Sequence, residues 1–273
     1  MTVFCRTTLN YTGTTPSAAP SPVEVEVLDG RAADLPGWEV CGFELLPHVS
    51  RVACWDDDDE IVAVHHPEVE DLARELTGCD HAMVSGHIKR NPDQAIRHQD
   101  LAPIRFVHSD FASGHADVIR RSFRAAIEDP GVVLAPRHAA LADAVEHARR
   151  LMIVQFWRNL GPPKMDLPLA LCDARTVRPD DARPFVVADY AGAGGGAFEA
   201  LAVVAPTDPG RHRWYTFPEM GADETIAFRT YDSDVVRAGG TFFTPHSAFR
   251  DPDVPLGEPA RSSIELRATC LFV

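Results

Sequence analysis

Several signatures of other protein classes are missing from this 273-residue sequence. Its 26 Lys and Arg are outnumbered by 40 Asp and Glu, and the net charge of −14 disfavours a nucleic-acid partner, because neutralising phosphates requires a basic surface. No apolar run reaches the roughly 18 residues that indicate a membrane-spanning helix. There is no G-x-S-x-G motif of a serine hydrolase and no fixed-period repeat of a solenoid or propeller.

Cysteine pairs and a targeting pattern are missing too. The six cysteines include no C-x-x-C pair, which is typical of reduced thiols in the cytoplasm. The N-terminal segment has no basic region followed by an apolar run, so we expect no signal peptide. The sequence therefore predicts a cytoplasmic enzyme or small-molecule binder, with neither a nucleic acid nor a membrane as partner. It does not indicate an oligomeric state.

The chain is long enough for one large domain or two small ones, and we expect a single domain over residues 1–273. Residues 12–22, rich in Pro, Ser, Thr and Ala, are expected to form an extended arm or linker. Apolar residues at three-and-four spacing predict helices over 66–78, 115–131 and 136–152. The acidic run 56–60 is interpreted as a solvated turn, with a hard-cation site as the alternative.

The second half of the chain has the composition of strands. Short β-branched or aromatic segments bounded by Pro, Gly or Asp predict strands over 104–111, 153–160, 184–190, 198–206, 213–217, 225–233, 241–249 and 263–273. No helical pattern separates the strands over 184–273, which excludes a βαβ-wound sheet there. The expected fold is mainly β with flanking helices (α+β), as an antiparallel sandwich or jelly roll.

One glycine-rich segment formally matches a nucleotide-binding motif. Gly192–Ala197 fits G-x-G-x-x-[GA], but the segment that follows is short, β-rich and ends in Pro. A nicotinamide site is therefore disfavoured. We interpret the segment as a loop, with a lid beside the mouth of the fold as one role for it.

Three His-x-Asp pairs occur, and their context distinguishes them. His115 and Asp117 begin a predicted helix, where positions i and i+2 do not face each other. The pair at positions 98 and 100 lies in a polar stretch without a predicted element. His108 and Asp110 end an apolar strand predicted over 103–107, and in a strand residues i and i+2 point to the same side. We therefore expect the pair His108/Asp110 to bind a metal.

A second histidine would complete a site of two imidazoles and one carboxylate, which leaves coordination positions open and is typical of non-haem Fe(II) oxygenases. His246, at the end of an aromatic strand, is the best candidate. Arg261 and Ser263 share one face of the last strand, an arrangement that suits the far end of a dicarboxylate.

These residues resemble the iron and 2-oxoglutarate signature of the Fe(II)/2-oxoglutarate-dependent oxygenases. Several further blocks, in order from about residue 60 to the C-terminus, resemble the CmcJ/AsaB-like family of hydroxylases and desaturases. The blocks are Val107–Phe111, Phe156–Asn159, Pro168–Asp173, His212–Tyr215, Tyr231–Ser233, Thr244–Phe249 and Arg261–Arg267. Each block alone is a weak signal, and together they are specific.

The resemblance implies a double-stranded β-helix, a jelly-roll variant, with Fe(II) held by His108, Asp110 and His246. It also implies that 2-oxoglutarate chelates the metal and reaches Arg261 and Ser263 with its far carboxylate. The gap from His246 to Arg261 is longer than is common in the wider superfamily, which leaves Arg267, on the same strand face, as a rival anchor. Fe(II), 2-oxoglutarate and O2 would then oxidise a small specialised metabolite or amino-acid derivative by hydroxylation, desaturation or oxidative cyclisation, releasing succinate and CO2. The alternatives are a cupin-like non-haem metal dioxygenase that does not use 2-oxoglutarate, and a non-catalytic small-molecule binder on the same fold.

Four further residues are weaker candidates for substrate contacts. Trp157 and Arg158 lie inside an apolar strand, where packing and an internal ion pair are equally good explanations. His212 and Tyr215 follow a predicted tight turn, and a core strand explains them without a ligand.

Overall fold

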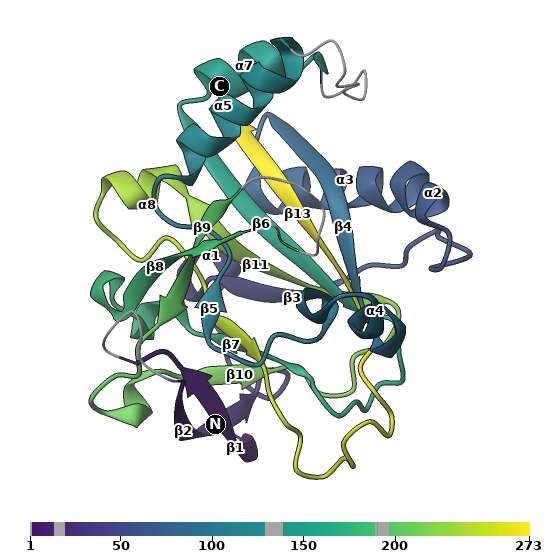
Figure 1. Cartoon of the computed structure of the whole chain (residues 1–273), viewed down its shortest axis with the longest axis vertical. Helices are drawn as coiled ribbons and strands as arrows, with labels where there is room; N and C mark the ends of the chain where they lie inside the picture. Colours follow the sequence, from purple (N-terminus) through teal and green to yellow (C-terminus); the bar gives the residue numbers. More distant parts are fainter. Residues whose placement is uncertain (1, 14–19, 129–138, 189, 191–196) are drawn as a thin grey trace.

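The computed structural model describes residues 2–13, 20–128, 139–188, 190 and 197–273, which form mostly strands with some helices (Figure 1). The larger sheet has eight strands in the order β1-β2-β10-β7-β12-β5-β9-β8. Their bounds, in that order, are Val3–Tyr11, Ser21–Asp29, Trp214–Thr216, Leu169–Cys172, His246–Ala248, His108–Ser109, Phe198–Val203 and Ala182–Val187. Every neighbouring pair is antiparallel except β10 with β2.

The smaller sheet has five antiparallel strands in the order β3-β11-β6-β13-β4. Their bounds are Phe43–Pro47, Glu224–Asp232, Arg150–Asn159, Ser263–Phe272 and His81–Arg90. β6 and β13 are buried on both faces because one face packs on the larger sheet and the other on helix α3. This double burial explains the continuous apolar run Leu151–Val154 of β6, whereas β13 alternates apolar residues with Ser263, Glu265, Arg267 and Thr269.

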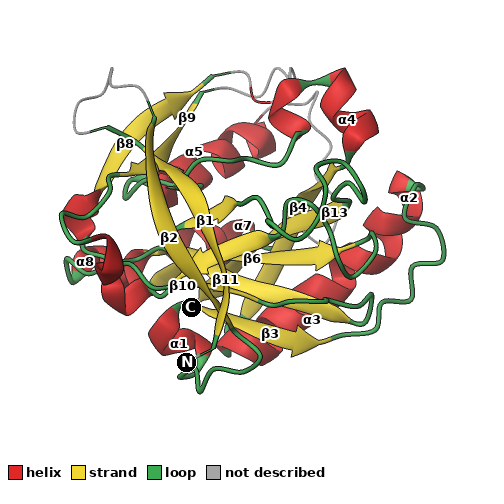
Figure 2. Cartoon of the chain, turned by 90° about the horizontal axis from the view of Figure 1, so that it is seen from below, coloured by secondary structure: helices red, strands yellow, loops and turns green. Residues whose placement is uncertain are grey.

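Short helices connect and cover the sheets. The α-helices are α1 (Trp38–Cys41), α2 (Asp58–Glu60), α3 (His66–Thr77), α4 (Pro92–Arg97), α5 (His115–Glu128), α7 (Ala142–His147) and α8 (Ser233–Arg237). A π-helical turn at Ile61–His65 joins α2 to α3, and 3-10 turns lie at Gln99–Leu101, Ala174–Thr176, Pro179–Asp181 and Pro209–Arg211. Figure 1 shows α5 and α7 together at one end of the molecule, far from the N-terminal strands, and Figure 2 shows β1 and β2 side by side.

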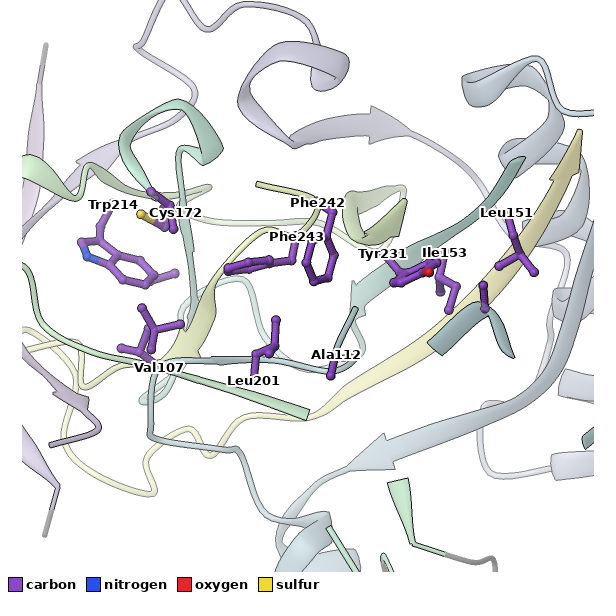
Figure 3. Close-up of a cluster of buried hydrophobic side chains, with 14 of the residues drawn as sticks. Val107, Ala112, Leu151, Ile153, Cys172, Leu201, Trp214, Tyr231, Phe242 and Phe243 are labelled. Atoms are coloured by element: carbon purple, nitrogen blue, oxygen red, sulfur yellow. The ribbon is translucent and has the colours of Figure 1, made fainter. Parts of the chain in front are cut away.

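The main core lies between the two sheets. Trp214, Cys172 and Leu201 come from the larger sheet, and Ile153 and Tyr231 come from the smaller one. Figure 3 shows their side chains in one continuous cluster. Burying side chains of this size contributes about 1.5–3 kcal/mol for each large apolar residue. The core therefore holds the two sheets face to face and fixes any site built between them.

The structure corrects several expectations about the elements. The helix predicted over 136–152 is confined, in the described part, to Ala142–His147, because residues 150–152 pair in register with the end of β13. Long-range strand pairing overrides the helical periodicity there. A short helix, α8, lies between strands of the second half, and four strands of the first half, β1 to β4, were not predicted.

The expectations for the acidic run, the N-terminal arm and the glycine-rich segment are confirmed only in part or lie outside the described residues. The acidic run, interpreted as a solvated turn, is exposed at residues 56–59 but forms the start of a helix: Asp57 caps α2, and Asp58 pairs with Lys89. Ser21 and Pro22, expected in the arm, belong to β2, and residues 14–19 lie outside the described residues. Residues 191–196 of the glycine-rich segment lie outside them as well.

Candidate active site

Strand register brings the predicted metal ligands together. β12 pairs antiparallel with β5, and His246 lies directly opposite His108. Their ring centroids are 4.3 Å apart. β5 is shorter than the predicted strand and begins at His108, but Asp110, two residues later, still points to the same side. One ligand atom from each of the three residues lies within 4.8 Å of the others.

Backbone carbonyls orient both imidazoles. Nδ1 of His108 lies 2.8 Å from the Phe106 carbonyl oxygen, and Nδ1 of His246 lies 3.1 Å from that of Thr244. A carbonyl only accepts, so each Nδ1 donates and each Nε2 keeps its lone pair. These Nε2 atoms lie 3.8 Å and 4.0 Å from Oδ1 of Asp110. Three lone-pair donors thus surround one point, with the second-sphere hydrogen bonds that metal-ligating histidines usually have.

The charge states of these groups suit a metal. Burial, and then the neighbouring His246, lower the pKa of His108 to about 3, and burial also lowers the pKa of His246. Burial opposes ionisation of Asp110, but the charge of Arg267 and the two imidazoles hold its pKa well below the usual range. At neutral pH the site therefore offers two neutral imidazoles and a carboxylate, the forms that bind divalent cations.

A buried charge network supports Asp110. Nε of Arg267 donates to Oδ2 of Asp110 over 3.0 Å, which leaves Oδ1 facing the histidines. Arg267 and Arg90 both donate to Glu265, over 3.3 Å and 2.9 Å. Burial opposes the ionisation of Glu265, yet the charges of Arg90 and then Arg267 lower its pKa to about 2. The carboxylate ligand is thus held in one orientation by groups that are themselves fixed.

The three predicted ligands line a small cavity together with Arg90, Gln155, Arg261 and Glu265. Nε of Arg261 donates to the Ser263 hydroxyl over 3.0 Å, and its guanidinium lies 5.0 Å from the Trp157 ring centroid. Burial, and then the charge of Arg90, lower the pKa of Arg261 to about 9, so it remains a cation at neutral pH. Within the described residues, its guanidinium donates to the Ser263 hydroxyl and the Leu167 carbonyl, which are both uncharged.

Two buried polar atoms near these groups lack partners. Within the described residues, Oε1 of Gln155 and Nε1 of Trp157 have no hydrogen-bond partner. Buried polar atoms are rarely left unpaired in native proteins, so such atoms point to a bound ligand or water. The site holds three arginines and two carboxylates, so its positive charges outnumber its negative ones, and a divalent cation would increase this excess. The arginines are Arg90, Arg261 and Arg267, and the carboxylates are Asp110 and Glu265. The residues present therefore fit a metal together with a dianionic ligand.

Comparisons with known proteins agree with this chemistry. The sequence matches, over residues 6–271, the family model described as an Oxidoreductase/YMDC permease-like domain. It is 29% identical to the Fe(II)/2-oxoglutarate-dependent dioxygenase nvfI of Aspergillus novofumigatus, over 78% of this chain and 68% of that protein. It is also 29% identical to the hydroxylase/desaturase CTB9 of Cercospora beticola, over 83% of this chain and 69% of that protein.

The fold is shared as well. A solved structure of a variant of the iron and alpha-ketoglutarate-dependent endoperoxidase NvfI superposes with a TM-score of 0.75 at 21% identity, over 99% of this chain and 98% of that one. The chain belongs to this family of AsaB-like Fe(II)/2-oxoglutarate-dependent oxygenases. It is thus an oxidoreductase, and the relative nvfI is named as dependent on Fe(II) and 2-oxoglutarate.

Of the four weaker candidates, one lies beside the candidate active site of this AsaB-like oxygenase and three do not. Trp157 lies beneath the Arg261 guanidinium. Arg158, its neighbour in β6, points to the other face, where it donates to the His48 and Ala222 carbonyls.

The other two candidates are parts of the core. His212 lies between Tyr11 and Asp181, 3.2 Å from each. Tyr215 packs against Phe43. For Arg158, His212 and Tyr215, the placement favours structural roles over substrate contacts.

The His212 assignment can be tested by substitution. His212→Ala would remove the His212 partner of the buried Tyr11 hydroxyl, so the free energy of unfolding should fall by about 1–3 kcal/mol, whereas the Asp181 oxygen would keep its bonds to Arg211 and Arg178. Binding of 2-oxoglutarate to the iron-loaded protein should be unchanged. Thermal unfolding and an anaerobic titration measure the two effects. His147→Ala, at an exposed site, is the control and should change neither. A loss of ligand binding at unchanged stability would contradict the structural role.

Sequence reasoning missed Arg90, Gln155 and Glu265. Glu265 carried a readable signal, because Arg261, Ser263, Glu265 and Arg267 alternate along one strand and therefore share a face. Gln155 shares the face of Trp157 for the same reason. Arg90 had no such signal, because its approach to the site depends on the pairing of β4 with β13.

Proposed function

We propose that His108, Asp110 and His246 hold Fe(II), and that Arg261 with Ser263 binds the far carboxylate of 2-oxoglutarate. One observation carries this proposal: the three ligands and the buried Arg261 line the same cavity. Arg267 is then a positioning residue for Asp110 instead of the co-substrate anchor, because its guanidinium is bonded to Asp110 and Glu265.

The protein's own groups orient the metal ligands, bind the co-substrate and exclude water. The Phe106 and Thr244 carbonyls hold the imidazoles with Nε2 toward the metal, and Arg267 holds the carboxylate. Ile104, Leu169 and Ala248 complete the cavity with apolar surface that limits water. Together the bound metal and co-substrates supply the oxidising chemistry, in which 2-oxoglutarate becomes succinate and CO2. The chain thus fixes where a substrate C–H bond must lie.

The proposal also covers the substrate class, the core fold and the cellular compartment. We infer that the enzyme oxidises a small specialised metabolite by hydroxylation, desaturation or cyclisation. The two stacked, largely antiparallel sheets support a double-stranded β-helix as the core of a single domain over residues 1–273. Six free cysteines support a reducing, cytoplasmic setting.

Co-binding of metal and co-substrate is the direct test. Under anaerobic conditions, Fe(II) and 2-oxoglutarate added together should produce a weak visible charge-transfer band, and neither should produce it alone. Admitting O2 should then release succinate in amounts equal to the 2-oxoglutarate consumed. Iron binding without the band would favour the cupin-like dioxygenase that does not use 2-oxoglutarate. Absence of both iron binding and turnover would favour a non-catalytic binder.

A further inference from the structure

A second, larger cavity adjoins the proposed metal site. It encloses about 430 Å³, within the range of sites for drug-sized ligands, and His108 and Asp110 line both cavities. A molecule bound in it would lie directly against two of the metal ligands. This position makes the larger cavity the natural place for the substrate of the proposed oxidation.

Strand register makes one wall of this cavity apolar. In the β8–β9 pair, Phe185 lies opposite Ala200 and Val187 lies opposite Phe198. Residues two apart in a strand share a face, so these four side chains form one apolar patch, and all four line the cavity. Phe106 extends the patch, with its ring centroid 5.9 Å from that of Phe185.

Charged groups of the cavity are already paired or lie in solvent. The Tyr190 hydroxyl lies 2.7 Å from the Arg90 guanidinium and donates to the Asp100 carbonyl, and the Asp100 carboxylate lies 3.6 Å from His98. Among the described lining residues, Arg105 is the one permanently charged cation, and it is exposed. The buried carboxylate of the lining, Asp110, is bonded to Arg267 and is a proposed metal ligand. A substrate carboxylate or ammonium group would therefore lose its hydration in this cavity without gaining an uncommitted buried partner.

We propose that the substrate held in this cavity is an uncharged, predominantly hydrocarbon molecule with a ring system, and not a free amino acid or a carboxylic acid. The inference rests on the proposed function and narrows its substrate class. Aromatic walls favour flat or polycyclic bodies, because edge-to-face and stacked contacts add to the burial of apolar area.

The test uses a neutral fluorescent probe and charge-matched competitors. N-phenyl-1-naphthylamine is titrated into the full chain loaded anaerobically with Fe(II) and 2-oxoglutarate. It is then displaced with 1-naphthalenemethanol, 1-naphthoate or 1-naphthylmethylammonium, which share one ring system. We expect the alcohol to bind at least tenfold more tightly than either charged compound. Equal or tighter binding of a charged compound would overturn the proposal.

Two variants locate the probe. Ala200→Trp fills the cavity and should weaken probe binding at least tenfold, whereas Ile96→Ala, at an exposed position on α4, should leave it unchanged. Val187→Arg adds a cation to the wall and should shift the preference at least tenfold toward naphthoate, which keeps the test decisive if Ala200→Trp fails to fold. Unchanged binding and selectivity in the folded variants would refute the assignment.

Failure of this inference differs from failure of the proposed function. Succinate release by the wild-type protein without any added substrate reports on the metal and 2-oxoglutarate alone. If that release occurs and the charge selectivity does not, the substrate class is wrong and the proposed function stands. If succinate is never released and the probe still binds selectively, the cavity assignment stands without the oxidation.

Discussion

Replacing Asp110 with alanine is expected to reduce bound iron to less than about a tenth of the wild-type stoichiometry and to abolish succinate release. Asp110 supplies the one negatively charged ligand atom of the proposed site, 3.8 Å and 4.0 Å from the two imidazole nitrogens. Without it, two neutral imidazoles and the nearby Arg267 cation would face a divalent ion. Anaerobic iron binding, measured by metal analysis after gel filtration, tests the ligand assignment independently of turnover.

The chain contains a matched control for this substitution. Asp117 occupies the same place in a second His-x-Asp motif, but it lies on the surface of α5. Asp117→Ala should therefore retain wild-type iron and activity. Circular dichroism should show that both variants keep the fold, because the core between the sheets does not include either carboxylate. Iron retained at full stoichiometry by the Asp110 variant would refute the proposed ligand set.

The sequence located the candidate ligands because local geometry separates the three His-x-Asp pairs. A strand places residues i and i+2 on one side, whereas a helix start or a polar stretch does not. The partner His246 could be chosen only by its position at the end of a strand. Its actual place opposite His108 depends on the β5–β12 pairing, which no local pattern encodes.

The weaker candidates show that residue patterns alone did not identify which side chains face the cavity. Trp157 and Arg158 are adjacent in a strand, so alternation alone shows that they cannot both face the cavity. The helix predicted over 136–152 was too long, and the N-terminal pair β1–β2 was not predicted. Both errors have the same cause, because long-range pairing decides whether an ambiguous segment becomes a strand. Register and sheet order, which position Arg90 and the cavity wall, are properties of the whole chain.

Replacing Arg261 with lysine is expected to raise the dissociation constant for 2-oxoglutarate at least tenfold, equivalent to about 1.4 kcal/mol or more. A guanidinium can donate to both oxygens of a carboxylate while it keeps its bond to Ser263 and its position over Trp157, and a single ammonium group cannot do all three. Titration of 2-oxoglutarate into the iron-loaded protein, followed by the visible band, measures the effect. Iron affinity should remain close to that of the wild type.

The same substitution at Arg267 separates the two candidate anchors. Arg267 bonds to Asp110, so Arg267→Lys should weaken iron binding by about 10–100-fold, the usual effect of losing a second-sphere partner. Once saturated with iron, this variant should bind 2-oxoglutarate as the wild type does. The opposite pattern, with 2-oxoglutarate binding lost at Arg267 and kept at Arg261, would make Arg267 the anchor. Measuring both constants in both variants therefore assigns each arginine to metal positioning or to co-substrate binding.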